Sequence, residues 1–297
     1  MKKFYLVAAT LLAVLMLAQV SPAICEEEEK PVPLGWDNEL LAYLNLSQAA
    51  FDNWSAGGEN TMGWQTGVIG IFTNYAPRRE WVNSLRLTYG MQKTGDQEAR
   101  KSIDEIRLGT VYNYIARYHV DPYVALKFES QFAKGYEYSD SDKMEISGFM
   151  DPGYFTESAG LGKKFFGGIM RSRLGVAFKQ TVTDKFPGPY ADDPETEEIE
   201  KVRSEVGAEW VTGVDWPISE NLRYIMLVDA FSNMKASNEI DVRWDNLLAA
   251  KVASFVTVSL DFRLFYDRDI STKRQLSQSL AIGFTFTLAE ARFKDDE

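Results

Sequence analysis

The sequence predicts an all-β protein, a twelve-stranded antiparallel transmembrane β-barrel of the outer-membrane type. Three observations predict this fold: an export signal at the N-terminus, twelve segments in which apolar and polar residues alternate, and connections that are long and short in turn. Together they indicate an exported chain that crosses a bilayer with strands rather than helices.

The N-terminus has the parts of a secretory signal peptide. Lys2 and Lys3 precede an apolar run over residues 4–17, and Ser21 and Ala23 frame a small-x-small cleavage site. The run is short for a membrane helix, and no later stretch approaches the roughly eighteen apolar residues that such a helix needs. We therefore expect a signal peptide (1–23), an acidic, Pro-rich periplasmic leader (24–38), a β-barrel (39–288) and a charged C-terminal tail (289–297).

Residues 256–266 show the strand pattern most clearly. Their even-numbered positions are apolar or aromatic, whereas the odd positions from 257 to 263 hold Thr, Ser, Asp and Arg. A period of two is that of a strand with one apolar and one polar face, and eleven residues can cross a bilayer when the strand is tilted. The twelve segments that fit this template are 39–48, 62–75, 80–92, 104–116, 122–133, 153–165, 169–182, 201–214, 221–233, 239–250, 254–267 and 275–288.

The connections between these segments alternate in length. They are long after the first, third, fifth and seventh segments, moderate after the ninth and eleventh, and short after every even one, as at residues 76–79, 166–168 and 217–220. Short periplasmic turns and longer external loops are typical of outer-membrane barrels, and an even strand count returns both termini to the periplasm. This pattern predicts a location in the outer membrane of a Gram-negative bacterium.

Alternation alone leaves open which face points outward, because a soluble barrel or sandwich buries its apolar face whereas a membrane barrel exposes it. The polar positions mix charged and small residues, and aromatic residues gather near segment ends, as interfacial girdles require. These features favour a membrane barrel with a polar lumen. The aromatic residues are Trp36, Trp64, Tyr75, Trp81, Tyr112, Tyr114, Tyr123, Trp210, Trp216 and Tyr266.

The charge balance excludes one class of partner. The chain has 32 basic and 43 acidic residues, and loss of Lys2 and Lys3 leaves 30 against 43, a net charge of −13. Such a protein repels nucleic acid. We expect outer-membrane lipid, lipopolysaccharide and the barrel-assembly machinery as partners, with a small-molecule solute possible. Cys25 is the only cysteine; it is either lipidated or simply unpaired, and Ile24 argues against a lipobox.

The sequence gives little support for catalysis. His119 is the only histidine, in an expected short periplasmic turn, whereas barrel hydrolases generally need a histidine as general base. We therefore expect no enzyme, no cofactor and no metal. The acidic loop after the seventh segment matches no calcium-loop spacing and is interpreted as a solvated loop.

The polar positions predict a lumen lined by both signs of charge. A selective pore would show one biased ring of charge, whereas a mixed lining predicts ion pairs inside the barrel. We expect a narrow or gated pore for small solutes; the alternatives are a closed-lumen structural or ligand-binding barrel and, less favoured, a barrel-embedded enzyme. The lumen-lining candidates are Arg86, Arg107, Lys127, Glu129, Arg173, Lys179, Arg203, Glu205, Asp241, Arg243, Asp261 and Arg263.

One external loop has a composition that favours an inward position. Trp54 is a large apolar side chain, and the neighbouring glycines Gly57 and Gly58 allow a tight backbone. The loop is predicted to fold back into the barrel mouth; the alternative is a bulge that places Trp54 at the membrane interface.

Residues 44–60 read Leu-Asn-Leu-Ser-Gln-Ala-Ala-Phe-Asp-Asn-Trp-Ser-Ala-Gly-Gly-Glu-Asn. This stretch resembles the opening signature of an uncharacterised family of Gram-negative outer-membrane proteins, catalogued as domain of unknown function 3078. The resemblance implies a barrel in the outer membrane and supplies no activity, catalytic residue or ligand.

Charge pairing also predicts the register of the tenth and eleventh segments. Three registers place Asp261 opposite Asp241, Arg243 or Asp245, and only the second avoids like charges. Because directly opposed charges contribute roughly 0.2 to 1 kcal/mol each, we expect Asp261 beside Arg243 and Arg263 beside Asp241.

Overall fold

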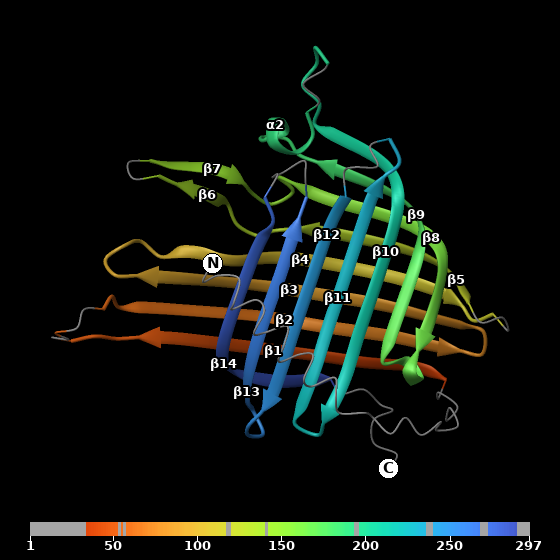
Figure 1. Ribbon diagram of the computed structural model, residues 1–297, viewed down its shortest axis with the longest axis horizontal. Coiled ribbons are helices and arrows are strands. Elements are labelled where there is room, and N and C mark those ends of the chain that lie inside the picture. Colours follow the sequence, from red (N-terminus) through yellow and green to blue (C-terminus); the bar gives the residue numbers. More distant parts are fainter. Residues whose placement is uncertain are drawn as a thin grey trace. The chain divides into compact units, whose positions relative to one another are not determined.

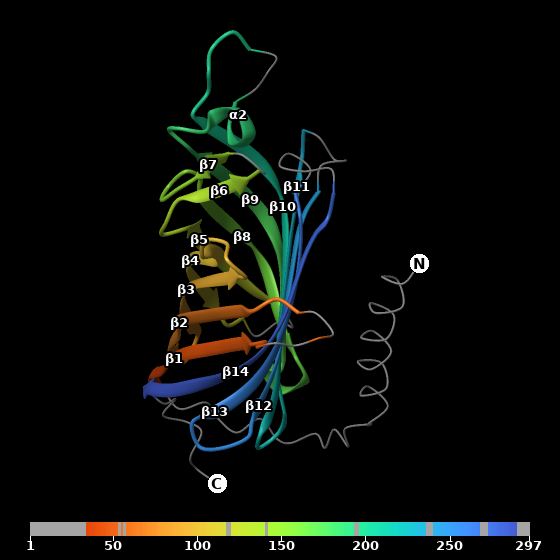
Figure 2. The same ribbon diagram turned by 90° about the vertical axis from the view of Figure 1, so that its left-hand side faces the viewer.

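The structure is a computed structural model that describes residues 34–52, 55, 58–116, 120–139, 142–192, 196–235, 240–267 and 273–289. Twelve of its strands form one closed antiparallel barrel (Figure 1, Figure 2). This confirms the predicted fold class and strand count. The barrel strands are β1 (Gly35–Ala49), β2 (Thr61–Ala76), β3 (Arg79–Thr94), β4 (Arg100–Tyr114), β5 (Asp121–Ser130), β8 (Gly153–Phe165), β9 (Met170–Val182), β10 (Val202–Ser219), β11 (Leu222–Asn233), β12 (Ile240–Lys251), β13 (Val256–Tyr266) and β14 (Gln275–Ala289).

Consecutive barrel strands are neighbours, and β1 closes the ring against β14, with pairs from Leu40 opposite Ala289 to Leu46 opposite Ile282. The tight turns contain residues that cannot continue a strand. Pro77 lies between β2 and β3, and between β8 and β9 the short 3-10 helix η1 (Phe166–Gly168) holds Gly167 and Gly168 at φ 62° and 95°. Positive φ favours glycine, so the chain reverses there at little cost.

The outward face of the barrel is apolar. Leu280, Ile282 and Leu174 are 69%, 63% and 60% exposed, although each lies in the middle of a strand. Aromatic pairs lie near both ends of the outer wall: Trp36 against Trp81 at the short turns, with ring centroids 5.8 Å apart, and Trp64 against Tyr89 near the loops, 5.9 Å apart. An exposed apolar band between aromatic girdles is the surface that a bilayer solvates.

The inner wall holds the polar face, and glycines there make room for aromatic rings. A Cβ atom on Gly175 would approach the Tyr123 hydroxyl to 2.6 Å, and one on Gly207 would approach the Phe231 ring to 2.5 Å. Tyr123 is only 3% exposed and packs inside the barrel, and Tyr75 lies directly opposite the buried Glu80 on the inner face, so the interpretation of these two as girdle residues was wrong. The close packing explains why small residues alternate with charged ones on this face.

The end of the barrel opposite the short turns carries additional structure (Figure 1). The connection between β5 and β8 contains an unpredicted hairpin, β6 (Gly135–Tyr138) and β7 (Lys143–Ser147), and the connection between β9 and β10 contains the helix α2 (Pro187–Tyr190). The loop after β3 is shorter than predicted because β4 already begins at Arg100. Within the described ranges, no helix is long and apolar enough to span a bilayer.

The predicted register of β12 and β13 was wrong. Asp245 lies opposite Arg263, Arg243 lies opposite Phe265, and Asp261 lies opposite Leu247. The turn is longer than expected, running from the end of β12 at Lys251 to the start of β13 at Val256. Only one opposite-charge pair is directly opposed here, because Asp241 and Arg243 have partners on distant strands and Asp261 pairs with Arg263 on its own strand.

Candidate functional site: the charged lumen

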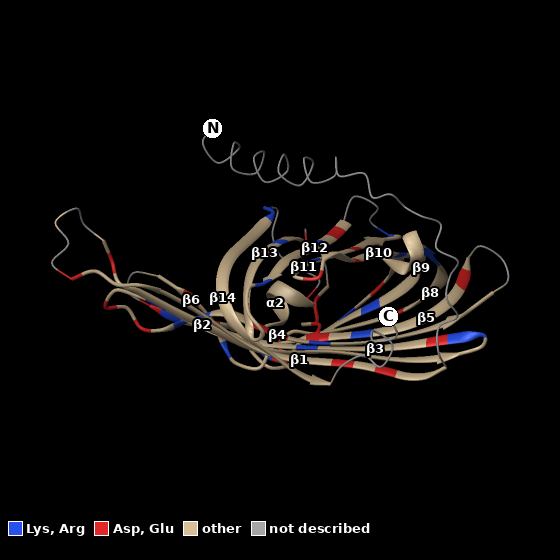
Figure 3. Cartoon of the chain, turned by 90° about the horizontal axis from the view of Figure 1, so that it is seen from below, with Lys and Arg blue, Asp and Glu red and all other residues tan. Residues whose placement is uncertain are grey.

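The strand registers place all twelve predicted lumen residues on the inner face of the barrel. Arg86 is opposite Arg107, Arg107 opposite Glu129, and Lys179 opposite Glu205, and these pairs continue the same face from strand to strand. Figure 3 shows basic and acidic residues on strands of both facing walls. What the sequence could not show is which of these side chains meet.

The middle of the lumen is crossed by ion pairs, which we call the central layer. Arg107 on β4 donates from Nη1 to Asp245 Oδ2 on β12 at 2.9 Å. Arg243 on β12 donates from Nη1 to Glu129 Oε2 at 2.5 Å and from Nη2 to Glu105 Oε1 at 2.6 Å. Five strands separate β4 from β12 in either direction around the ring, so these bonds span the full width of the lumen.

The central layer is balanced in charge and shielded from water. Glu105 also accepts a bond from Arg263 on β13 at 3.2 Å and contacts Arg107. Arg263 is further held by Asp261 on its own strand, Nε to Oδ1 at 2.9 Å. Glu105 and Asp245 are only 7% and 8% exposed. With Arg86, the layer contains four guanidinium groups and four carboxylates.

A second set of charged side chains lies on the same inner face, on strands β5, β9, β10 and β11. Lys127 on β5 donates to Asp229 on β11 at 2.5 Å and contacts Glu209 on β10. Arg173, one of the predicted lumen residues, lies over the Tyr123 ring with Cζ 5.5 Å from its centroid.

Nearer the loops, Lys179 on β9 donates to Asp241 on β12 at 2.6 Å and lies 3.9 Å from Asp267. Arg203 donates to Glu205 at 3.3 Å. A cavity of about 140 Å³ lies among Lys127, Lys179 and Arg243 and the carboxylates that face them. We call this cavity the outer chamber.

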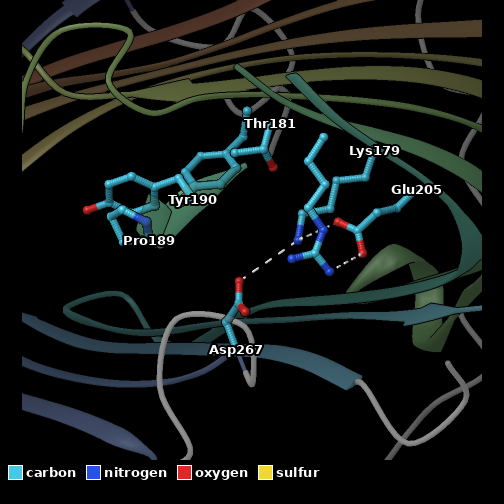
Figure 4. A pocket seen from close by; sticks show the side chains of 8 residues that line it. Lys179, Thr181, Pro189, Tyr190, Glu205 and Asp267 are labelled. Atoms are coloured by element: carbon cyan, nitrogen blue, oxygen red, sulfur yellow. Dashed lines mark hydrogen bonds and ion pairs between the residues drawn. The ribbon is translucent and has the colours of Figure 1, made fainter. Parts of the chain in front are cut away.

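The helix α2 reaches the mouth of the barrel above the outer chamber. Pro189 and Tyr190 line a small pocket together with Lys179, Glu205 and Asp267 (Figure 4). Burial raises the pKa of Tyr190, whose hydroxyl donates to the carbonyl of Ile146 at 3.3 Å. Sequence reasoning missed this inward loop. The only signal for it is that Pro187, Pro189 and Tyr190 interrupt an otherwise acidic and polar connection.

At the opposite end, near the short turns, ion pairs also connect strands that are not neighbours, and Arg223 on β11 donates to Glu39 on β1 at 3.2 Å. Glu80 is 1% exposed and accepts bonds of 3.0 Å from Lys164 and Arg171. Arg223 on β11 bonds Asp215 on the neighbouring strand through two nitrogens, at 2.7 and 2.6 Å. Charge pairs therefore recur along the whole length of the lumen.

The predicted inward loop after the first strand lies mostly outside the described residues. Trp54 and Gly57 are outside them, and Gly58 is exposed, so the inward position of this loop stays a prediction. His119 and part of the acidic loop also fall outside. Among the side chains that the structure does describe, no group of three or more His, Cys, Asp or Glu residues could hold a metal ion.

Comparison with known families supports the family resemblance. The model of the family described as "Protein of unknown function (DUF3078)" matches residues 46–136, which confirms the resemblance noted from residues 44–60. No curated protein matches this chain significantly in sequence.

Several solved structures are similar in fold. The translocator domain of the autotransporter NalP from Neisseria meningitidis has 9% identity and a TM-score of 0.38, over 95% of this chain and 98% of that one. The TodX monoaromatic hydrocarbon channel has 11% identity and a TM-score of 0.34, over 87% and 85%. The beta domain of the Bordetella autotransporter BrkA has 9% and 0.32, over 85% and 99%. At these identities and TM-scores, the similarities say nothing about activity.

Proposed function

We propose that this protein is a gated pore for small solutes in the outer membrane of a Gram-negative bacterium, and that the described conformation is its closed state. The observation that carries the proposal is the central layer, in which Arg107 and Arg243 span the lumen to carboxylates on the opposite wall. The lining is charged and polar, and the outer chamber above the layer has room for a solute. No catalytic step forms part of this proposal.

Closure by side chains suits a gate. An ion pair can open by rotation of its side chains, because each charged group has other partners within reach: Arg243 contacts Glu105, Glu129 and Asp245. Arg107 likewise contacts Asp245, Glu105 and Glu129. When the central layer opens, each arginine can therefore move to another carboxylate. A buried charge left without any partner would instead cost several kcal/mol.

Conductance in planar bilayers tests the proposal. The double variant Arg107→Gln with Asp245→Asn removes one basic and one acidic group, so the layer stays neutral while one of its ion pairs between β4 and β12 is lost. We expect larger or more frequent openings than in the wild type. The matched control is Lys201→Gln with Asp184→Asn, which removes an exposed pair on the loops and should leave conductance unchanged.

A closed-lumen barrel is the second candidate, favoured by the near-complete burial of Glu209 and Glu80, each 1% exposed. Heat-modified mobility on detergent gels shows whether the wild type and the central double variant are folded. If both are folded and neither conducts ions in planar bilayers, the pore is refuted and the closed-lumen function remains. Outer-membrane lipid, lipopolysaccharide and the barrel-assembly machinery are the proposed partners in either case.

A further inference from the structure

The outer chamber differs from the rest of the lumen in its charge. Its lining contains three cationic side chains, Lys127, Lys179 and Arg243, and five carboxylates. The chamber therefore carries a formal charge of −2, whereas the central layer below it is neutral. The carboxylates of the chamber are Glu129, Glu209, Asp229, Asp241 and Asp267.

The existing cations leave this excess in place because each is shared. Lys127 is held between Asp229 and Glu209, and Lys179 lies near both Asp241 and Asp267. A shared lysine neutralises only one of the carboxylate charges that it contacts, and Lys179 also lies 3.9 Å from Glu205. A further positive group in the chamber would therefore be attracted by the carboxylates at low effective dielectric, where such attraction is stronger than in water.

The chamber also has aromatic walls. Phe231 and Phe265, from β11 and β13, line it together with Tyr154 from β8. The Lys179 ammonium lies over the Phe231 ring, 5.5 Å from its centroid, so this ring already takes part in a cation–π contact. Ring faces and a carboxylate excess around one cavity are the combination that binds organic ammonium ions.

The size of the chamber limits the ligand. Its volume of about 140 Å³ is close to that of cavities known to hold a single benzene ring, roughly 150 Å³. A polymer or a large glycan does not fit. A hydrated inorganic cation would fit but would gain nothing from the phenylalanine walls.

We infer that the outer chamber binds a small organic cation, an ammonium group on an apolar body of about one ring. The inference rests on the proposed function in that it names the solute class for the same lumen. Binding can nevertheless be measured without conductance, so the two proposals fail separately.

The experiment is calorimetric titration of the full chain in detergent with benzylammonium, and with benzyl alcohol and benzoate as neutral and anionic probes of similar shape. We expect the cation to bind, and the alcohol and the anion to bind at least about tenfold more weakly. Equal binding of the alcohol and the cation would overturn the inference, as would no binding of the cation to folded protein.

Two variants locate the site. Phe231→Leu removes the ring face and should weaken binding of the cation about 2- to 30-fold, the range of a cation–π contact. Its matched control is Phe262→Leu, which alters a ring packed against Trp244 on the lipid-facing side and should leave affinity unchanged. Asp229→Asn should also weaken binding, and Lys127 then keeps Glu209 as its partner.

Equal losses in Phe231→Leu and Phe262→Leu would place binding outside the chamber and refute the inference. If the cation binds as expected but no variant conducts, the gated pore fails and the chamber remains as the binding site of a closed barrel. If the pore conducts but the cation does not bind, only the assignment of the ligand fails.

Discussion

The central layer and the outer chamber are adjacent parts of one lumen, lined by strands of the same barrel, yet one is filled and the other is hollow. The four cations of the central layer are all arginines: Arg86, Arg107, Arg243 and Arg263. The two cations that line the outer chamber without belonging to the central layer are lysines, Lys127 and Lys179, which lie on one wall on either side of Thr156. The type of cation therefore differs between the closed and the hollow part.

Guanidinium geometry explains the difference. Arg243 bonds two carboxylates on different strands through separate nitrogens, Glu129 through Nη1 and Glu105 through Nη2. A planar fork of this kind fills space and fixes direction, whereas an ammonium is a compact point charge at the end of a thin stem. Four arginines matched to four carboxylates close the lumen, whereas lysines among an excess of carboxylates leave a cavity.

The largest effect is expected from loss of the carboxylate that holds the central layer together. Glu105→Ala removes an acceptor shared by Arg107, Arg243 and Arg263 and leaves buried positive charge without compensation, at a cost of about 3 to 5 kcal/mol. Urea unfolding in lipid vesicles, followed by tryptophan fluorescence, measures it.

The matched variant in the outer chamber is Asp229→Ala. It should cost only about 1 to 2 kcal/mol, because Lys127 keeps its contact with Glu209. If Glu105→Ala and Asp229→Ala lowered the free energy of unfolding equally, the ion pairs of the central layer would depend on one carboxylate no more than those of the outer chamber do.

A smaller effect is expected when the type of cation is exchanged. Arg243→Lys keeps the charge but loses the two-armed contact, which should cost about 1.5 to 3 kcal/mol and raise conductance by opening space in the central layer. The reciprocal change Lys127→Arg should fill the chamber and weaken binding of the organic cation without raising conductance. Unchanged conductance in Arg243→Lys would show that charge alone, and not the shape of the cation, closes the lumen.

The strands and their inner faces could be predicted because a period of two is a local property of the sequence. Residues 256–266 reveal their polar side without reference to any other segment, and all twelve barrel strands were predictable in this way. Strand ends were less predictable, as β4 shows, because the last residues of a strand pair only if the partner extends equally far.

The partners of the lumen charges could not be predicted from neighbouring strands. The register prediction assumed that Asp261 needs an arginine directly opposite, but Arg243 bonds Glu105 and Glu129 across the lumen, and Asp261 pairs with Arg263 two residues away on its own strand. Contacts across a barrel depend on the stagger of all its strands together, which no single pair of segments encodes. The same holds for Tyr190, whose place in the mouth depends on loops from two different hairpins.

The smallest of the expected effects concerns the loop that carries Tyr190 to the mouth. Asp151, just before β8, is 7% exposed and joins its loop to the one containing α2. Its Oδ1 accepts bonds from Thr183 Oγ1 at 3.0 Å and from the backbone N–H groups of Asp184 and Lys185 at 2.5 and 3.1 Å. The carboxylate therefore anchors the beginning of the loop that covers the outer chamber.

Burial favours a higher pKa for Asp151, but the N–H groups of Asp184 and Lys185 and the Thr183 hydroxyl outweigh it, so the pKa lies below its ordinary value. A depressed folded-state pKa contributes stability that is present above the unfolded value and is lost as the pH falls through the folded value. The loop anchor should accordingly persist at neutral pH and loosen only in acid, below the ordinary aspartate pKa of about 4.

Hydrogen exchange at the amides of Asp184 and Lys185 tests this anchor. Asp151→Ala should lower their protection by about 0.5 to 2 kcal/mol, the usual cost of losing a capping side chain, whereas Asp151→Asn keeps one oxygen acceptor and should lose less. The control is Lys201→Ala, which breaks only an exposed pair with Asp184 and should change protection little. If Asp151→Ala left the two amides as protected as in the wild type, α2 would be held at the mouth by its packing against the barrel, and the hollow part of the lumen would be covered independently of this carboxylate.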